Sequence, residues 1–471
     1  MKPSRLRHGL LAFAAVLLAA CGGSVDREDP TATLTAPMNG AMGITDKLVL
    51  TADAGDNDSV QRVEFQIDGA GLGDVEAPPY TVSLDSGAYA PGQHIVRARS
   101  RDEVRRHSPW STATVQFANA RKVPAGFESD EAFVTGLANA TAFAQAADGR
   151  FFIAQQTGEL RVADAEGRLL AAPFVQLGVD ANGERGLIGV ALHPDFASNG
   201  FVYLHYTTPA GGTHNRISRF TADGNVALAG SEEVLVDLPP LSSATNHNGG
   251  ALHFGPDGKL YVGVGDNANG DNAKDLASPL GKLLRFNDDG SIPDDNPFAG
   301  TQGGLAGAIW ASGLRNPFSF AFEPGGTRLY INDVGEKSWE EIDIGAAGAN
   351  YGWPDSEGPT SADGVTAPRF AYPHAASNPP GVGPGGFFTG KAIAGGAFYP
   401  ASGGSFPSDY ASNYFFADFD ARFIGRLDAA NDDAAYAFAS VTDAPVDLLV
   451  GLDGALYVLT RSGVTRIAVP S

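Results

Sequence analysis

The stretch LHFGPDGKLYVGVGD, from Leu252 to Asp266, carries the pattern that decides the fold of this chain. A short apolar segment runs into a Pro-Asp-Gly turn, and a segment of alternating character leaves it. Leu260, Val262 and Val264 therefore face one way, and the residues between them face the other. The stretch predicts two antiparallel strands joined by a tight turn.

Five weaker copies of this pattern recur along the last three-quarters of the chain. The copies start roughly 50 to 75 residues apart, which leaves room for one small sheet per copy with long loops between. A sheet that cannot bury both faces alone must stack on its neighbours. We therefore predict a six-bladed β-propeller, with an open array of β-sandwiches as the alternative. The weaker copies occupy residues 143–158, 190–207, 320–335, 395–419 and 448–463.

The composition agrees with an all-β protein and limits its partners. The chain has 471 residues, including 60 glycines and 30 prolines, which suits a fold with many turns. Its formal net charge of −22 repels nucleic acid and anionic lipid headgroups, so we expect neither as a partner. The charge fits a solubilising surface and, as a weaker indication, cation binding.

The first residues have the features of an export signal. Basic residues precede an apolar run over 10–20, which is too short to span a bilayer, and residues 1–20 are predicted to be a signal peptide. Leu18-Ala19-Ala20-Cys21 resembles a bacterial lipobox, which implies export and a lipid anchor on Cys21 as the only membrane attachment. Gly22 favours the outer membrane. Secretion with an incidental cysteine is the alternative.

The rest of the chain divides into a tether, a small domain, a linker and the propeller. Residues 21–30 are a polar tether, and residues 31–118 contain five short alternating segments with turn signals between them. VEFQIDGAGLGDVEAPPYTVSLD (63–85) resembles bacterial Ig-like modules, so a small Ig-like β-sandwich is expected there. Residues 119–126 form the linker, and 127–471 form the propeller.

Two loops next to tight glycines contain candidate catalytic and binding residues. Loops of several blades converge at the central channel of a propeller, where such sites usually lie. His247 follows Asn246 and precedes a Gly-Gly pair; it is a candidate general base, or a histidine bonded to a backbone carbonyl. Arg315 and Asn316 precede a proline and offer donors to carboxylate or quinone oxygens. Arg315 would alternatively tie two blades together.

Two acidic segments are candidates for binding a hard cation. Asp333 and Glu336 lie in the segment 332–336, where carboxylates and exposed carbonyls occur together. Residues 265–272 carry many short oxygen side chains that can wrap calcium, although an ordinary Asx-rich connection is the better explanation for them.

Several of these segments together resemble a known family. They include GERGLIGVALHPDFASNGFVYLHY (183–206), HNGGALHFGPDGKLYVGVGD (247–266) and IWASGLRNPFSFAF (309–322), in that order along the chain. Two further matching segments are 280–298 and 340–354. The combination resembles the glucose/sorbosone dehydrogenase family, the soluble quinoprotein sugar dehydrogenases.

The resemblance implies a fold, cofactors and residue roles. The family fold is a six-bladed propeller with pyrroloquinoline quinone (PQQ) over the channel and calcium beneath it. His247 falls on the position of the base that takes the proton of the sugar C1 hydroxyl while hydride passes to the quinone. Arg315 and Asn316 fall on quinone-contacting positions. The implied activity is PQQ- and calcium-dependent oxidation of an aldose or related alcohol, with an external electron acceptor.

The chain departs from the family pattern near the catalytic and metal positions. Asn246 stands where the family has an aspartate just before the base. Gly335-Glu336 stands where the family has a Gly-Pro pair whose backbone carbonyls hold calcium. A backbone carbonyl needs no particular side chain, so a metal site at Gly335 and Glu336 is still expected.

Larger departures concern cationic residues. The family has an Arg-x-Arg motif on the last blade. This chain reads Ala444-Pro445-Val446-Asp447 there, so both arginines are missing. Arg150 stands where a glutamine contacts the cofactor, and Arg422 is the candidate substitute for a missing lysine. PQQ carries several carboxylates that need cationic partners. The alternative function is therefore a non-catalytic cell-surface propeller that binds a glycan or a protein, as the related propeller of Hedgehog-interacting proteins binds a protein.

Overall fold

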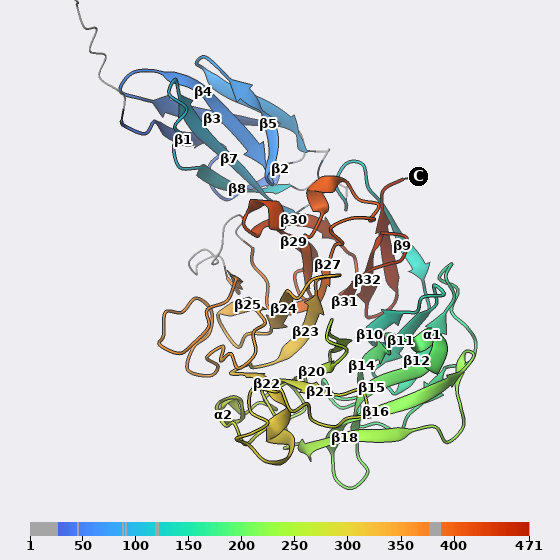
Figure 1. The fold of residues 1–471 in the computed structure, drawn as a ribbon. Helices are drawn as coiled ribbons and strands as arrows, with labels where there is room; N and C mark the ends of the chain where they lie inside the picture. Colours follow the sequence, from blue (N-terminus) through green and yellow to red (C-terminus); the bar gives the residue numbers. More distant parts are fainter. Residues whose placement is uncertain are drawn as a thin grey trace, which may run out of the picture.

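The computed structural model describes residues 27–44, 47–86, 89, 92–117, 122–375 and 388–470. A β-sandwich at the N-terminal side is followed by a ring of six small sheets, and Figure 1 shows the sandwich standing at the edge of the ring. The predicted signal peptide and Cys21 lie outside the described residues. Within these residues, no helix is both long enough and apolar enough to cross a membrane.

The N-terminal sandwich has eight strands, three more than the alternating segments predicted. One sheet has the order β1-β3-β6 and the other β2-β8-β7-β4-β5. Leu50, Phe65, Val96 and Val115 are buried between the sheets, as the period of two in their strands requires. The strands are β1 (Thr31–Ala36), β2 (Ala41–Ile44), β3 (Lys47–Gly55), β4 (Val60–Ile67), β5 (Ala70–Val75), β6 (Tyr80–Asp85), β7 (Gly92–Asp102) and β8 (Ser111–Phe117).

The propeller consists of six antiparallel sheets, which are its blades, as the six copies predicted. The first three are β10-β11-β12-β13, β14-β15-β16 with β17 and β18, and β19-β20-β21-β22. Their strands are β10 (Ala140–Gln145), β11 (Phe151–Gln155), β12 (Glu159–Ala163), β13 (Val175–Gln176), β14 (Leu187–Leu192), β15 (Phe201–Thr208), β16 (His214–Asp223), β17 (Val226–Ala227), β18 (Glu233–Pro240), β19 (Leu252–Phe254), β20 (Leu260–Val264), β21 (Lys282–Phe286) and β22 (Ile309–Ser312).

The last three blades are β23-β24-β25-β26, β27-β28-β29-β30 and β31-β32-β33-β9. Their strands are β23 (Pro317–Phe322), β24 (Leu329–Asp333), β25 (Trp339–Ile344), β26 (Phe370–Pro373), β27 (Ile393–Phe398), β28 (Tyr414–Asp418), β29 (Phe423–Asp428), β30 (Ala434–Ser440), β31 (Pro445–Val450), β32 (Leu456–Thr460), β33 (Val464–Ala468) and β9 (Glu128–Val134).

The sixth blade closes the ring, because it takes its outer strand from the start of the propeller. β9 pairs antiparallel with β33, with Val464 opposite Val134 and Ala468 opposite Glu128. The two ends of the propeller sequence are thereby joined by backbone hydrogen bonds, which leaves no open edge between the first and last blades.

Stacking of blades explains the pattern of the best copy. Leu260, Val262 and Val264 pack with Tyr203 and Ile217 of the second blade, whereas Tyr261 belongs to a cluster with residues of the fourth blade. Every residue of β20 is buried, because both faces of the sheet are covered by neighbours. The alternation along β20 therefore determines which neighbouring blade each side chain packs against. It does not separate a buried face from a solvent-exposed one.

The sandwich packs on the outer strand of the fifth blade. Ile95 of β7 forms a buried cluster with Ala434 and Tyr436 of β30, and Arg426 donates a hydrogen bond to the carbonyl of Asp68 over 3.2 Å. The outer strand of a blade lies far from the channel, so this contact leaves the hub of the ring uncovered.

Candidate functional site at the hub

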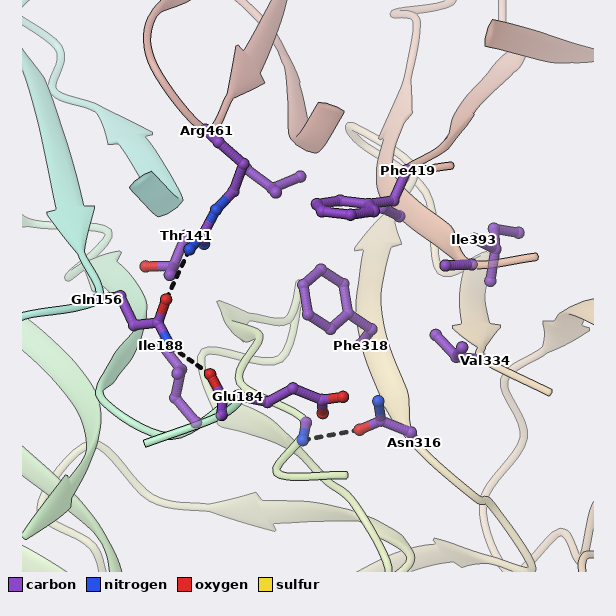
Figure 2. A pocket seen from close by; sticks show the side chains of 15 residues that line it. Thr141, Gln156, Glu184, Ile188, Asn316, Phe318, Val334, Ile393, Phe419 and Arg461 are labelled. Carbon is purple, nitrogen blue, oxygen red and sulfur yellow. Dashed lines mark hydrogen bonds between the residues drawn. The ribbon is translucent and has the colours of Figure 1, made fainter. Parts of the chain in front are cut away.

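A cavity of about 380 Å³ lies at the hub, and all six blades contribute to it (Figure 2). The innermost strands β10, β14, β23, β27 and β31 each supply at least one lining residue, and the third blade supplies Gly249. The lining consists of Thr141, Gln156, Gly183, Glu184, Ile188, Gly249, Asn316, Phe318, Val334, Ala392, Ile393, Ala394, Phe419, Val446 and Arg461. This volume lies within the range of about 300–1,000 Å³ that small-molecule sites occupy.

Strand direction explains why these residues meet. Thr141, Ile188 and Val446 lie near the first residues of their inner strands. The second strand of each blade runs antiparallel to the first, so its last residue returns to the same side. Gln156 and Arg461, which directly follow second strands, therefore reach the cavity as well.

His247 forms a fixed pair with Asp266 beside this cavity. Its Nδ1 lies 2.7 Å from Oδ1 of Asp266, and Oδ2 of Asp266 accepts a hydrogen bond from Trp353 Nε1 over 2.8 Å. Because the carboxylate accepts a proton from Nδ1, the lone pair of the neutral ring lies on Nε2. Among the described residues Nε2 has no hydrogen-bond partner, so it keeps a lone pair that can accept a proton, although His247 itself is not one of the residues that line the cavity.

The loop that carries His247 is held against the wall of the cavity. Glu184 Oε2 accepts the backbone N–H of His247 over 2.7 Å, and Asn316 Oδ1 accepts that of Gly249 over 2.9 Å. Gly249 has a φ of +69°, and a Cβ there would lie 2.4 Å from the carbonyl oxygen of Gly263. Glycine is therefore required at this position.

Asp266 supplies the carboxylate that the sequence lacks at position 246. Asn246 is half-buried and does not line the cavity. Asp266 lies two residues after the end of β20, and the fold brings it to the Nδ1 side of the ring. Its signal in the sequence was its place after the second strand of the best copy.

Arg315 lies behind the cavity wall, whereas its neighbour Asn316 lines the cavity. Nη1 of Arg315 donates to the carbonyl of Val334 over 2.8 Å, and the guanidinium lies 5.5 Å from the Trp353 ring centroid. The backbone N–H groups of Arg315 and Asn316 donate to Asp333 over 2.8 and 2.6 Å. Burial raises the pKa of Asp333 to about 6, although these two bonds act in the opposite direction.

The predicted metal residues Gly335 and Glu336 begin a turn that surrounds a carboxylate. Glu336 N–H donates to Oε1 of Glu357 over 2.8 Å, and the next three N–H groups donate to the same oxygen. Burial opposes ionisation of Glu357, but these bonds outweigh it and lower its pKa. Gly335 also lines a small cavity of about 10 Å³ together with Asp333 and Glu341.

Carboxylates lie at and next to this small cavity, which the cationic Arg315 also lines. Both carboxylate oxygens of Asp343, on the same strand as Glu341, are buried and have no hydrogen-bond partner among the described residues. Burial raises the pKa of both carboxyls well above the usual range, as expected for acids without a counter-ion. The described residues hold no group of three or more His, Cys, Asp or Glu side chains arranged for a metal, so calcium would also need backbone carbonyls.

Arg150 and Arg422 are engaged elsewhere and do not line the cavity. Arg150 pairs with Asp148 at 2.7 Å and donates to Asn225, and Arg422 donates to the carbonyl of Thr442 over 2.8 Å. Arg150 directly precedes β11, whose opposite end carries Gln156 to the cavity, so Arg150 lies at the far end of that strand.

Arg461 is the cavity residue that sequence reasoning missed. Its Nη2 donates to Oε1 of Gln156 over 2.6 Å, and its Nη1 donates to the carbonyl of Ala140 over 3.0 Å (Figure 2 shows the first bond). It directly follows β32, the second strand of the last copy, which is the signal that would have identified it. Among the lining residues it is the only Lys, Arg or His, and Glu184 is the only carboxylate.

Comparison with known proteins adds to this geometry. Residues 137–468 match the family model described as Glucose / Sorbosone dehydrogenase, and residues 30–98 match a bacterial Ig domain. The crystal structure of soluble aldose sugar dehydrogenase from Escherichia coli in the apo-form covers 73% of this chain and 100% of its own chain, with 27% identity and a TM-score of 0.62.

Curated relatives match over shorter regions. Aldose sugar dehydrogenase of Escherichia coli (strain K12) is 39% identical over 202 residues, which are 42% of this chain and 53% of that protein. Quinoprotein glucose dehydrogenase B of Acinetobacter calcoaceticus is 34% identical over 206 residues, covering 38% and 42%. Hedgehog-interacting protein of Mus musculus is 30% identical over 227 residues, covering 42% and 32%. The alignments thus span about half or less of these relatives.

Proposed function

Because this chain belongs to the glucose/sorbosone dehydrogenase family, we propose that it oxidises an aldose sugar or related alcohol by hydride transfer to PQQ, with calcium as the second cofactor. The observation that carries the proposal is the His247–Asp266 pair, whose free Nε2 lies in a loop pinned to the wall of the hub cavity. The names of two relatives, an aldose sugar dehydrogenase and a quinoprotein glucose dehydrogenase, support the substrate class and the quinone.

The residues of the hub have separate tasks in this reaction. When bound, PQQ supplies the hydride acceptor and calcium supplies a Lewis acid. His247 takes the proton of the substrate hydroxyl on Nε2, and Asp266 stabilises the imidazolium that results. Trp353 holds Asp266 in place through its indole N–H.

Other side chains bind and shield. Asn316, which lines the cavity, would hold a quinone oxygen, and Gly335 and Glu336 would offer backbone carbonyls to calcium. Phe318, Phe419 and Ile393 line the cavity with apolar surface, which favours a flat ring and excludes water.

The proposal for the location of the protein rests on its first residues. We propose that the protein is exported and anchored by lipid on Cys21, at the outer membrane. An anchored enzyme of this class would pass electrons to an external acceptor.

Titration of purified apoprotein with PQQ and calcium chloride tests the proposal. We expect the absorption spectrum of a bound quinone, followed by reduction of an electron-accepting dye when aldoses are added. Absence of dye reduction with every aldose, despite bound quinone, would contradict the oxidation.

The alternative is a non-catalytic propeller that binds a glycan or protein. It is favoured by the single cationic side chain of the cavity and by the similarity to Hedgehog-interacting protein. This alternative would be supported over the dehydrogenase if the apoprotein does not bind PQQ but does bind a glycan on an array or a captured protein.

A further inference from the structure

We infer that Arg461 is the residue of the hub cavity that binds a carboxylate of the ligand, in place of the missing Arg-x-Arg. The inference rests on the proposed function, because PQQ is the carboxylated ligand that the proposal names. It goes beyond that function by assigning the anionic end of the ligand to one side of the cavity.

The first argument is position. The segment Ala444-Pro445-Val446-Asp447, at the start of β31, has no cationic side chain. Pro445 lies opposite Thr460 in the pairing of β31 with β32, and Arg461 N–H donates to the carbonyl of Ala444 over 3.1 Å. Val446 and Arg461 both line the cavity. The adjacent strand therefore delivers a guanidinium to the place that β31 leaves without charge.

The second argument is unpaired charge. Arg461 has no ion pair with any described residue, whereas Arg466, five residues on in the same blade, pairs with Asp453 at 2.6 Å. Both acceptors of Arg461, the Gln156 side chain and the Ala140 carbonyl, are neutral, and each terminal nitrogen retains a second N–H. Burial lowers the pKa of Arg461. The negative charge of Asp443 acts in the opposite direction, but the Asp443 carboxylate is hydrogen-bonded to Ser462.

The third argument is orientation. Gln156 fixes the guanidinium, because its own amide donates to the carbonyls of Gly183 and Arg185 over 2.6 and 2.9 Å. Figure 2 shows Arg461 and Gln156 on one side of the cavity and Val334 and Ile393 on the other. A preorganised guanidinium at one end of an apolar cavity fits a flat ligand with a carboxylate at that end.

Equilibrium binding of PQQ to apoprotein in the presence of calcium tests the inference, with calorimetry as a readout that needs no turnover. We expect Arg461→Gln to weaken PQQ binding by roughly ten- to a hundredfold, the scale of a lost charged hydrogen bond, and Arg461→Lys to weaken it less. The trimethyl ester of PQQ should bind wild type and Arg461→Gln equally, because it has no carboxylate. Arg466→Gln is the matched control and should bind PQQ like wild type.

The outcomes separate the two proposals. Equal PQQ affinity of wild type and Arg461→Gln would overturn the inference and leave the dehydrogenase proposal standing. Failure of wild type to bind PQQ would overturn the proposed function. In that case binding of quinoline-2,4-dicarboxylate tests the inference. Equal affinity of Arg461→Gln and wild type for this probe would overturn the inference. Thermal unfolding checks that the variants are folded, and Arg461→Gln should melt no lower than Arg466→Gln, since it removes a desolvated charge.

Discussion

The two sides of the hub differ in how their residues are encoded. On the side of the third and fourth blades, His247 and Asn316 lie in glycine-rich loops that stand out in the sequence. On the side where the sixth blade meets the first, Arg461 bonds to Gln156 across 305 positions of sequence. The residues on the first side belong to recognisable sequence motifs. Those on the second side are single residues far apart in the sequence, which come together only because the ring closes.

Residues reach the cavity from the loop that leads into an inner strand, from the inner strand itself, and from the position just after a second strand. Gln156, Phe419 and Arg461 are of the last kind, directly after β11, β28 and β32. Asp266, which bonds to His247 beside the cavity, lies two residues after the end of β20. A repeat-by-repeat alignment of second strands would therefore find site residues that motif reading overlooks.

Removing His247 should have the largest effect on the motif side. Without the Nε2 base, His247→Ala should lower the rate of dye reduction by roughly 10²- to 10⁴-fold, while PQQ affinity stays within about twofold. Steady-state kinetics of the holoprotein and calorimetry measure the two quantities. An undiminished rate would remove His247 from the base role.

Loss of the carboxylate partner should have a smaller effect. Asp266→Asn removes the charge that orients and stabilises the imidazolium, so we expect the rate to fall by roughly 10- to 100-fold. Asp271→Asn, in the short helix α2 (Gly270–Lys274) and exposed, is the control and should keep the wild-type rate. Equal rates for both variants would show that Asp266 has no part in orienting His247.

Substitution of Gly249 tests the packing of the motif side. A Cβ at Gly249 would meet the Gly263 carbonyl, whereas one at Gly258, with a similar φ of +71°, would meet nothing within 4 Å. Gly249→Ala should therefore lower the free energy of unfolding by about 2–4 kcal/mol, and Gly258→Ala by about 1 kcal/mol. Guanidinium unfolding measures both, and equal losses would show that only the φ angle matters.

The pH dependence of stability should differ slightly between the two sides. Burial raises the pKa of Asp447, in the sixth blade, to about 7, and that of Asp333, in the fourth, to about 6, from a usual value of 3.8. The folded protein therefore binds protons that the unfolded chain has released, so stability falls as pH rises towards these values.

Variants of the two carboxyls separate their contributions. Asp447→Asn should flatten the slope of unfolding free energy against pH between pH 6 and 7, and Asp333→Asn should flatten it between pH 5 and 6. Urea unfolding at half-unit pH steps measures the slopes. Unchanged slopes in both variants would contradict the raised pKa values.

Most of the fold was open to prediction because its information is local. Turn residues and alternating strands of the six copies predicted six sheets, and the sheets observed agree. Three strands of the sandwich were missed, since β2 has four residues and β1 and β5 contain few buried side chains. Closure of the sixth blade by β9 was not visible, because its partner β33 lies more than 300 residues further along the chain.

By itself the sequence determined the ring of blades, the Ig-like sandwich and the family, and it singled out His247, Arg315 and Asn316. Only the tertiary structure decided that Asp266 rather than residue 246 holds the imidazole, and that Arg461 brings a positive charge to the hub. The reason is physical: turn chemistry and strand alternation depend on neighbours in the chain. Which side chain meets which at the channel depends instead on strand pairing and on how the blades stack.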